Sequence, residues 1–125
     1  MKVYQCFCDE TRLRILNLLV EGPLCVCHLT EIIGVAQPKV SRHLKALREA
    51  GALETERCYN WTIYHLPETP SPIMKTNLEC LRDAREEEPV FQADLKTRAA
   101  IVERIASGSS EDLPEQIRVL ANTCC

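Results

Sequence analysis

The sequence of 125 residues is long enough for one compact domain and too short for two separate hydrophobic cores. Hydrophobic residues make up 46% and charged residues 26% of the chain, which is typical of a globular protein. The net charge of −3 is unusual for a protein that binds nucleic acid, and no apolar run reaches the roughly 18 to 20 residues of a membrane span. We therefore expect a globular protein with no membrane partner.

Eight cysteines are the most unusual feature of the composition. The first residues contain no apolar segment typical of a signal peptide, so we expect the protein in the cytoplasm. In that reducing compartment cysteines serve as free thiols, metal ligands or redox sensors rather than as disulfide staples. Close pairs suit chelation, and the absence of Cys-x-x-Cys spacing argues against a zinc ribbon or a thioredoxin-type site. The pairs are Cys6 and Cys8, Cys25 and Cys27, and Cys124 and Cys125, with Cys58 and Cys80 alone.

The hydrophobic pattern predicts three helices in the first half of the chain. Asp9 is a suitable N-cap for a helix that ends before the Gly-Pro pair at residues 22–23. A second helix is expected over about residues 27–33. A third should begin at Gln37, because the proline that follows is tolerated in the first helical turn, and should end before Gly51.

The pattern then changes to strands and returns to helix. Residues 53–57 and 61–66 are typical of two strands joined by a short turn, in which Asn60 suits a left-handed conformation. After a linker, helical patterning covers residues 73–88 and, beyond a proline, residues 90–106.

These elements predict a mainly α-helical fold with a β-hairpin wing, the winged helix-turn-helix. It should occupy residues 1–106 as a DNA-binding domain. Residues 107–125 are Gly/Ser-rich and acidic, and we expect a flexible tail that ends in the Cys124 and Cys125 pair.

The third predicted helix carries the positive charge that the chain as a whole lacks. Residues 37–51 contain four cations against one acid, a net charge of +3. The apolar stripe of this helix consists of Val40, Leu44 and Leu47. Arg42 lies almost opposite that stripe, in the first turns where a recognition helix meets base edges, and suits bidentate pairing with guanine. The residues expected to contact bases or phosphates are Gln37, Lys39, Ser41, Arg42, Lys45, Arg57 and Asn60.

Four motifs resemble those of a known family. They are DETRLRIL at residues 9–16, LCVCHL at 24–29, QPKVSRHL at 37–44 and WTIYHL at 61–66. In this order they look like the ArsR/SmtB repressors, and more narrowly like the arsenical-responsive branch. The resemblance covers residues 2 to about 106 and implies a homodimer built on the N-terminal and C-terminal helices. It also implies an operator-binding repressor that leaves DNA when As(III) or Sb(III) binds, with no organic cofactor.

Cys25 and Cys27 are the strongest candidates for the inducer site. On a regular helix, residues i and i+2 point about 200° apart, so their two sulfurs would not share one ion. Either Cys25 precedes the helix, or ligation distorts the first turn and disturbs the helix that supports the DNA-reading helix. A helix N-terminus also lowers a thiol pKa and favours the thiolate that binds metal.

The chain departs from the family pattern at Thr30, where members of this branch usually carry a third cysteine. Trivalent arsenic prefers three thiolates. Either two suffice, as they would for a methylated trivalent arsenical, or a third comes from elsewhere. Cys124 and Cys125 are the first candidates, because the tail reaches almost any surface of a dimer at about 3.3 Å per extended residue.

The other cysteines are weaker candidates for ligation. Cys6 and Cys8 have the spacing of a pair, although burial of these cysteines beside Phe7 is equally compatible with the sequence. Cys58 would lie on the wing, close to DNA. Cys80 is expected to pack in the apolar stripe of a C-terminal helix.

The histidines argue against a zinc sensor of the kind that ligates metal on the C-terminal helix, because residues 70–106 contain none. His28 stands where the arsenic motif usually has Asp, and we expect it at the surface. His43 is expected to be structural.

Two alternatives remain at this point. One is a Cd(II) or Pb(II) sensor with four thiolates, for example Cys25 and Cys27 with Cys6 and Cys8, because softness alone does not separate these ions. The other is a thiol redox protein or metalloid chaperone, which only the tail cysteines favour. The sequence contains no Ser-His-Asp arrangement and no phosphate-binding loop, so we expect no enzyme activity.

Overall fold

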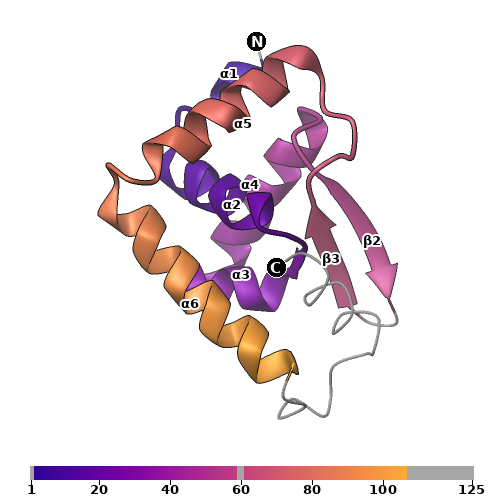
Figure 1. Ribbon diagram of the computed structural model, residues 1–125. Coiled ribbons are helices and arrows are strands. Elements are labelled where there is room, and N and C mark those ends of the chain that lie inside the picture. The colour runs from indigo at the N-terminus through magenta and orange to yellow at the C-terminus, as the bar shows by residue number, and fades with distance from the viewer. Residues whose placement is uncertain (1, 59–60, 107–125) are drawn as a thin grey trace.

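The computed structural model describes residues 2–58 and 61–106, which contain six helices and three strands. Figure 1 shows α2, α3 and α4 between the long C-terminal helix α6 and the strands β2 and β3. No helix in the described ranges is long and apolar enough to cross a membrane. In chain order the elements are α1 (Lys2–Gln5), α2 (Glu10–Val20), β1 (Leu24–Cys25), α3 (Val26–Ile33), α4 (Gln37–Glu49), β2 (Glu54–Cys58), β3 (Trp61–His65), α5 (Pro72–Ala84) and α6 (Pro89–Ala106).

The ends of the first helices follow from local chemistry, as predicted. The carboxylate of Asp9 caps α2 by accepting a hydrogen bond from the backbone N–H of Arg12 at 3.1 Å. Helix α3 ends at Gly34, whose φ of 73° is left-handed and whose N–H donates to the carbonyl of Thr30 at 2.9 Å. Helix α4 begins at Gln37, as the sequence predicts.

The wing is a three-stranded antiparallel sheet in the order β1-β3-β2. The predicted hairpin is confirmed, with β2 and β3 paired from Glu54 opposite His65 to Cys58 opposite Trp61. The edge strand β1 was not predicted, because two residues are too few to show an alternating pattern. It pairs with β3 through Cys25 opposite Ile63, so the first thiol of the pair lies at the sheet edge.

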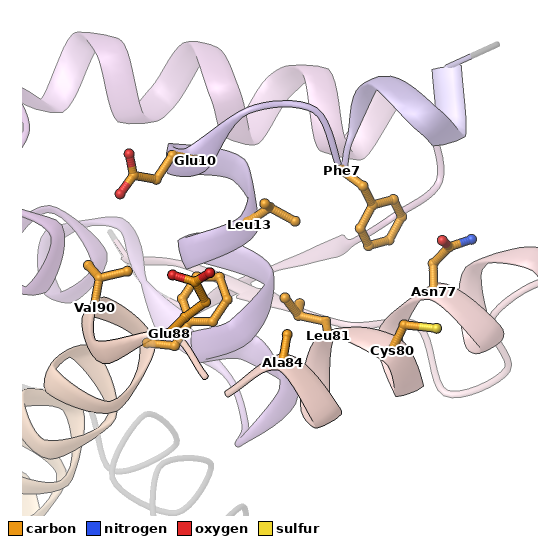
Figure 2. A pocket seen from close by; sticks show the side chains of 10 residues that line it. Phe7, Glu10, Leu13, Asn77, Cys80, Leu81, Ala84, Glu88 and Val90 are labelled. Atoms are coloured by element: carbon orange, nitrogen blue, oxygen red, sulfur yellow. The ribbon is translucent and has the colours of Figure 1, made fainter. Parts of the chain in front are cut away.

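Helix α5 buries the stripe Met74, Leu78 and Leu81, at spacings of four and three residues. Cys80 lies off this stripe and is exposed, so the expectation that it packs in the core is wrong for the single chain. It lies instead beside a groove of about 450 Å³ between the start of the chain, α2, α5 and α6 (Figure 2). The groove is lined by Phe7, Glu10, Leu13, Asn77, Cys80, Leu81, Ala84, Glu88, Val90 and Phe91.

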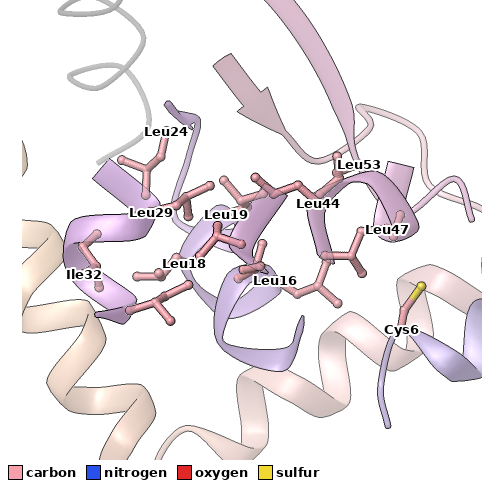
Figure 3. Close-up of a cluster of buried hydrophobic side chains, with 14 of the residues drawn as sticks. Cys6, Leu16, Leu18, Leu19, Leu24, Leu29, Ile32, Leu44, Leu47 and Leu53 are labelled. Atoms are coloured by element: carbon pink, nitrogen blue, oxygen red, sulfur yellow. The ribbon is translucent and has the colours of Figure 1, made fainter. Parts of the chain in front are cut away.

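One continuous hydrophobic core joins α2, α3 and α4 (Figure 3). The predicted stripe of α4, Val40, Leu44 and Leu47, is confirmed as buried. Burial of one such side chain stabilises the fold by about 1.5–3 kcal/mol. Because Leu29 of α3 belongs to the same cluster as Leu44 of α4, a displacement of α3 would disturb the packing of α4.

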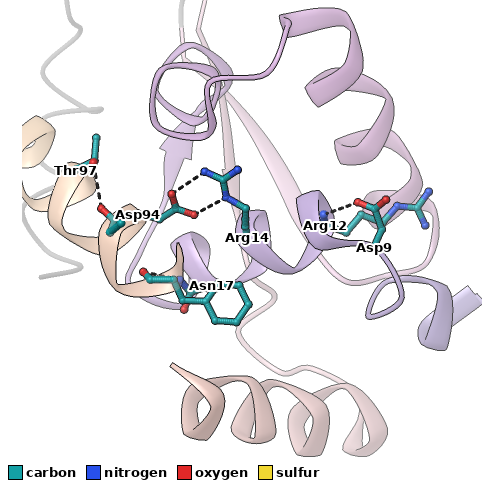
Figure 4. Close-up of polar contacts among 8 residues, drawn as sticks. Asp9, Arg12, Arg14, Asn17, Asp94 and Thr97 are labelled. Atoms are coloured by element: carbon teal, nitrogen blue, oxygen red, sulfur yellow. Dashed lines mark hydrogen bonds and ion pairs between the residues drawn. The ribbon is translucent and has the colours of Figure 1, made fainter. Parts of the chain in front are cut away.

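Polar contacts attach α2 to the C-terminal helices (Figure 4). Arg14 donates two hydrogen bonds, each 2.8 Å long, to the two carboxylate oxygens of Asp94 in α6. One turn further along α2, the guanidinium of Arg85 donates to the side chain of Asn17 at 2.6 Å and to Glu21 at 2.5 Å. The polar face of α2 therefore holds the junction between α5 and α6.

Candidate thiol site and DNA-binding surface

Cys25 precedes the helix that contains Cys27. It is the last residue of β1 and the N-cap of α3, with extended backbone angles of φ −85° and ψ 163°. Cys27 lies in the first turn of α3. The extended conformation removes the 200° separation that a continuous helix would impose, so the two sulfurs approach each other without distortion of α3.

The two sulfurs meet a third donor, the imidazole of His28. The ligand atoms of Cys25, Cys27 and His28 all lie within 4.8 Å of one another. The distance from Cys25 Sγ to His28 Nδ1 is 3.0 Å. Within residues 2–58 and 61–106, this is the one group of three or more His, Cys, Asp or Glu side chains with the spacing of a metal site.

The expectation that His28 lies at the surface is wrong, since only 6% of the residue is exposed. His28 is the third residue of α3 after the N-cap Cys25. A side chain at that position reaches back to the N-cap residue, as Glu does in a capping box. The signal was present in the sequence, but the predicted helix began at residue 27, which concealed the relation between His28 and Cys25.

The three groups compete for protons, and their pKa values separate as a result. A hydrogen bond from the Cys25 thiol lowers the pKa of Cys27, although burial opposes this. The same hydrogen bond raises the pKa of Cys25, and burial raises it further. Burial lowers the pKa of His28. The arrangement therefore favours a thiolate at the exposed Cys27 and a neutral imidazole beside a protonated Cys25.

An ion pair connects the thiol-bearing helix to the end of α6. Arg104 donates to the two carboxylate oxygens of Glu31 at 3.2 and 3.1 Å, and this contact lowers the pKa of Glu31. Glu31 lies one turn beyond Cys27, where its charge opposes formation of the Cys27 thiolate. Arg104 partly neutralises that charge.

The N-terminal cysteines face different surroundings. Cys6 is buried in the core, and burial raises its pKa. Cys8 is exposed, and its thiol donates to the carbonyl of Tyr4 at 3.1 Å. Neither belongs to the group of Cys25, Cys27 and His28, so the four-thiolate arrangement is not assembled among the described residues of this single chain.

Three predicted ligands and one predicted DNA contact fall on residues that the structure does not describe. The side chain of Cys58 and the residues Asn60, Cys124 and Cys125 lie outside the described part of the chain. Thr30, where the family pattern has cysteine, is part of α3, and its hydroxyl donates to the carbonyl of Val26 at 2.8 Å.

Four of the predicted DNA contacts on α4 are exposed, and the fifth, Ser41, is half-buried. On the wing, Arg57 of β2 is also exposed. The N-cap of α4 is Ala36, which offers no side-chain acceptor to the first N–H groups of this helix. The exposed side chains on α4 are Gln37, Lys39, Arg42 and Lys45.

His43 attaches α4 to the start of α2. Its Nδ1 accepts a hydrogen bond from Arg12 Nε at 3.1 Å, and its Nε2 lies 3.9 Å from a carboxylate oxygen of Asp9. Burial lowers the pKa of His43, and the neighbouring cations lower it further against the opposing effect of Asp9. The neutral ring accepts from Arg12, which agrees with the expected structural role.

Comparison with known proteins finds transcriptional regulators. Residues 9–55 match the family described as bacterial regulatory protein, arsR family. The chain is 50% identical over 70 residues to the arsenic resistance transcriptional regulator ArsR1 of Pseudomonas putida, a match of 54% of this chain and 55% of that protein. It is 36% identical over 80 residues to the arsenical resistance operon repressor of Bacillus subtilis, covering 62% of this chain and 76% of that protein.

The arsenical resistance operon repressor of Escherichia coli is 44% identical over 73 residues, 57% of this chain and 62% of that repressor. The match therefore spans less than two thirds of the length of the Pseudomonas putida and Escherichia coli proteins.

Two solved structures share the fold. HlyU from Vibrio cholerae aligns with a TM-score of 0.59 and 28% identity over 66% of this chain and 86% of that one. The transcriptional repressor BigR from Xylella fastidiosa aligns with a TM-score of 0.58 and 28% identity over 68% of this chain and 81% of that one. These alignments support the winged-helix fold.

Proposed function

Because the chain belongs to the ArsR family of bacterial regulatory proteins, we propose that it is a homodimeric transcriptional repressor that trivalent arsenic or antimony releases from its operator. Proteins of this family are DNA-binding regulators and not enzymes. The observation that carries the proposal is the approach of the Cys25 and Cys27 sulfurs at the start of α3. A repressor acts on cytoplasmic DNA, which agrees with the location expected from the sequence.

The donor set fits a trivalent arsenical. Two thiols that react with As(OH)₃ form two As–S bonds and release two molecules of water, which leaves one hydroxyl on arsenic. The exposed Cys27 meets the incoming species first, because its lowered pKa supplies the nucleophilic thiolate. The buried Cys25 then closes the chelate.

The path from the thiols to DNA is short. Cys25 belongs to the sheet through its pairing with Ile63, and Cys27 belongs to α3. Chelation changes how these two elements meet. Because Leu29 of α3 packs in the same core as Leu44 of α4, the change reaches the DNA-reading helix through packed side chains.

The surface of α4 suits DNA. Arg42 projects from the first turns of the helix opposite the buried stripe, in position for a base edge in the major groove. Lys39 and Lys45 flank it and suit phosphates. Arg57 and Asn60 would extend the contact from the wing.

The apolar groove beside α5 supports the homodimer. It lies next to the N-terminal and C-terminal helices, where the family resemblance places the dimer interface, and Phe7, Leu13 and Phe91 contribute to its wall. Two large apolar side chains near the ends of these helices are exposed in the single chain, Tyr4 at 48% and Ile73 at 38%. A second copy would remove these surfaces from water.

Cys124 and Cys125 are part of this proposal as a source of the third thiolate that Thr30 does not provide. Helix α6 approaches α3 at its C-terminal end, where Arg104 contacts Glu31. The last described turn of α6 therefore contacts the helix that contains Cys27. Removal of residues 108–125 is expected to lower As(III) affinity while two-thiol organoarsenicals still bind.

The proposal is tested by fluorescence anisotropy of a labelled operator fragment with the full-length reduced protein. As(III), Sb(III), methylarsenite and peroxide are added in turn. The trivalent species should release DNA, and release should disappear in Cys25→Ser and in Cys27→Ser while the DNA affinity without inducer stays the same.

Cys8→Ser is the matched control, because Cys8 is also an exposed thiol in the N-terminal half of the chain but lies outside the group of Cys25, Cys27 and His28. It should respond to As(III) as the unchanged protein does. Persistence of the complex in every added species would contradict the proposal, and so would normal release in both serine variants.

A further inference from the structure

The chemistry proposed above leaves one substituent of arsenic without a partner. When Cys25 and Cys27 displace two hydroxyls of As(OH)₃, the third hydroxyl stays on arsenic. A hydroxyl both donates and accepts hydrogen bonds, whereas a bound sulfur is a weak acceptor. The protein groups around that hydroxyl therefore decide how the site ranks trivalent arsenicals that form the same two bonds to sulfur.

Burial directs this hydroxyl toward solvent. In the thiol group, which consists of Cys25, Cys27 and His28, the first residue is 1% and the last 6% exposed. Cys27 is exposed. Arsenic that joins the two sulfurs enters from the side of Cys27, and a hydroxyl turned inward would lose its hydration without a new partner. Its favourable position is on the outer side, next to Cys27.

One acidic side chain borders this outer side. Glu31 follows Cys27 by four residues in α3, so the two side chains are neighbours on one face of the helix, with Cβ atoms about 5–6 Å apart. The charge of Glu31 is close enough to act on both Cys27 and His28. The Thr30 hydroxyl, by contrast, donates its proton within the helix, to the carbonyl of Val26.

Arg104 of α6 holds the carboxylate of Glu31 in a fixed orientation. Its guanidinium donates to both carboxylate oxygens, at 3.2 and 3.1 Å, and such paired bonds set the plane of the carboxylate. The same contact lowers the pKa of Glu31 and keeps it ionised. An ionised carboxylate has about four lone-pair positions, and Arg104 occupies two, so Glu31 has acceptor capacity for a hydroxyl.

We infer that Glu31 is a specificity-determining residue of the thiol site, which accepts a hydrogen bond from the hydroxyl left on arsenic, and that Arg104 is its positioning residue. The inference rests on the proposed function, because it concerns arsenic bound by Cys25 and Cys27. It adds no bond to arsenic beyond the two As–S bonds. It describes the adduct with two sulfurs, which a tail thiolate would convert into one with three.

Methylarsenite, CH₃As(OH)₂, isolates the contribution of the hydroxyl. Its reaction with the two thiols forms two As–S bonds and releases two molecules of water, as for As(OH)₃, but a methyl group stays on arsenic. That group donates no hydrogen bond to Glu31. A site that bonds to a ligand hydroxyl discriminates against the analogue that lacks it. Glu31 should therefore favour inorganic As(III) over methylarsenite.

The experiment uses the full-length reduced protein with Cys124→Ser and Cys125→Ser, so that no tail thiolate replaces the hydroxyl. Affinities for As(III) and methylarsenite are measured by competition with dithiothreitol. In Glu31→Gln, the ratio of the As(III) affinity to the methylarsenite affinity should fall about tenfold, as for loss of a hydrogen bond to a charged group. Arg104→Gln should lower this ratio by about two- to fivefold, because the carboxylate remains but loses its support.

The ratio removes an effect that Glu31 has on both arsenicals. Its charge opposes formation of the Cys27 thiolate, so Glu31→Gln should help both species to bind to the same degree. Glu103→Gln is the matched control, because it removes another exposed carboxylate, on α6. This control should change the ratio by less than about twofold.

X-ray absorption at the arsenic edge gives a readout that needs no variant of Glu31. With the two tail cysteines replaced, inorganic arsenic should have two sulfur neighbours and one oxygen neighbour. Thr30→Cys supplies a third sulfur, which releases the hydroxyl as water. In that background Glu31→Gln should no longer lower the affinity ratio.

The inference is wrong if Glu31→Gln leaves the ratio unchanged, or if arsenic has three sulfur neighbours in the protein without tail cysteines. Should Glu31→Gln fail to fold by circular dichroism, Arg104→Gln and the absorption spectrum still decide. Failure of the proposed function looks different: neither arsenical releases DNA. Failure of this inference alone leaves release by both arsenicals intact and their affinity ratio independent of Glu31.

Discussion

The thiol end of α3 and the helix α4, which we propose reads DNA, are neighbours along the chain and differ in how they are held. At the start of α3, Cys25 belongs to the sheet and His28 is buried against it. In α4 the buried stripe anchors one face, and the polar side chains, Arg42 among them, project freely into solvent. The donors at the start of α3 are held by contacts with other elements, whereas the exposed cations of α4 owe their common placement to helical periodicity.

In the proposed switch, the two regions have different requirements. A ligand site requires donors at fixed separations, so its side chains need support from several elements. A DNA-binding surface gains from long exposed cations that adjust to phosphates, and it needs only the correct placement of the helix. Substitutions at the thiol site should therefore alter inducer binding, and substitutions on the outer face of α4 should alter DNA binding alone.

The largest effect should come from the ion pair between α2 and α6, because α2 packs against both α3 and α4. Asp94→Ala removes the partner of Arg14, whose side chain is only 18% exposed, and leaves a cation between α2 and α6 without its carboxylate. The free energy of unfolding should fall by about 3–5 kcal/mol, as measured by urea denaturation of the full-length protein. The exposed Asp83→Ala is the control and should change it by less than about 0.5 kcal/mol. A loss below about 1 kcal/mol for Asp94→Ala would show that α6 is not needed to hold α2.

Arg42→Ala should weaken specific operator binding by about 1–3 kcal/mol and relax base preference at one position. The As(III) affinity of this variant should not change, because Arg42 is exposed on α4 and does not belong to the thiol group. Anisotropy with specific and scrambled DNA measures the effect. Lys96→Ala, which removes an exposed cation from α6, is the matched control. An equal loss on both DNA sequences would assign Arg42 to phosphate contact instead.

Thr30→Cys should add a third thiolate to the thiol site. Thr30 follows Cys27 by three residues, so the two side chains are neighbours on the surface of α3. We expect As(III) affinity to rise about tenfold or more, about 1.4 kcal/mol, with DNA affinity unchanged in its absence. Thr97→Cys is the matched control, because Thr97 makes the same bond to a helix carbonyl, at 3.1 Å, on α6. Equal affinities in the two variants would contradict a site on α3.

The smallest expected effect concerns the hydrogen bond between Arg12 of α2 and His43 of α4. The folded-state pKa of His43 is depressed below 6.5, with burial as its main cause and Arg12, Lys39 and Arg42 adding to it against Asp9. The unfolded chain therefore binds more protons, and stability that is complete above pH 6.5 declines as the pH falls below that value. The loss should be about 0.5–1.5 kcal/mol or less, the worth of one hydrogen bond.

Urea denaturation at pH 7.5 and 5.5 measures this decline, and His43→Gln should reduce it. The variant His65→Gln provides the comparison on the wing. A decline of the same size in His43→Gln would assign the pH dependence to other groups.

Periodicity explains which parts of the fold were predictable. The helices α2, α4, α5 and α6 and the hairpin β2–β3 repeat their apolar residues often enough for their period to be recognised. The short elements α1 and β1 were missed because four and two residues contain no period. The error at Cys80 has the same origin, because several registers fit the loose apolar pattern of α5 and packing selects Met74, Leu78 and Leu81.

The sequence by itself determined the winged-helix class, the buried stripe of α4 and the exposure of Arg42, and it predicted Cys25 and Cys27 as ligands. These depend on local propensity and on the spacing of residue types. Only the tertiary structure decided that Cys25 is extended, because its conformation comes from pairing with Ile63, 38 residues away by number. That pairing makes Cys25 an N-cap and turns the side chain of His28 inward. A short edge strand thus sets where α3 begins, and the spacing of three residues then brings His28 to Cys25.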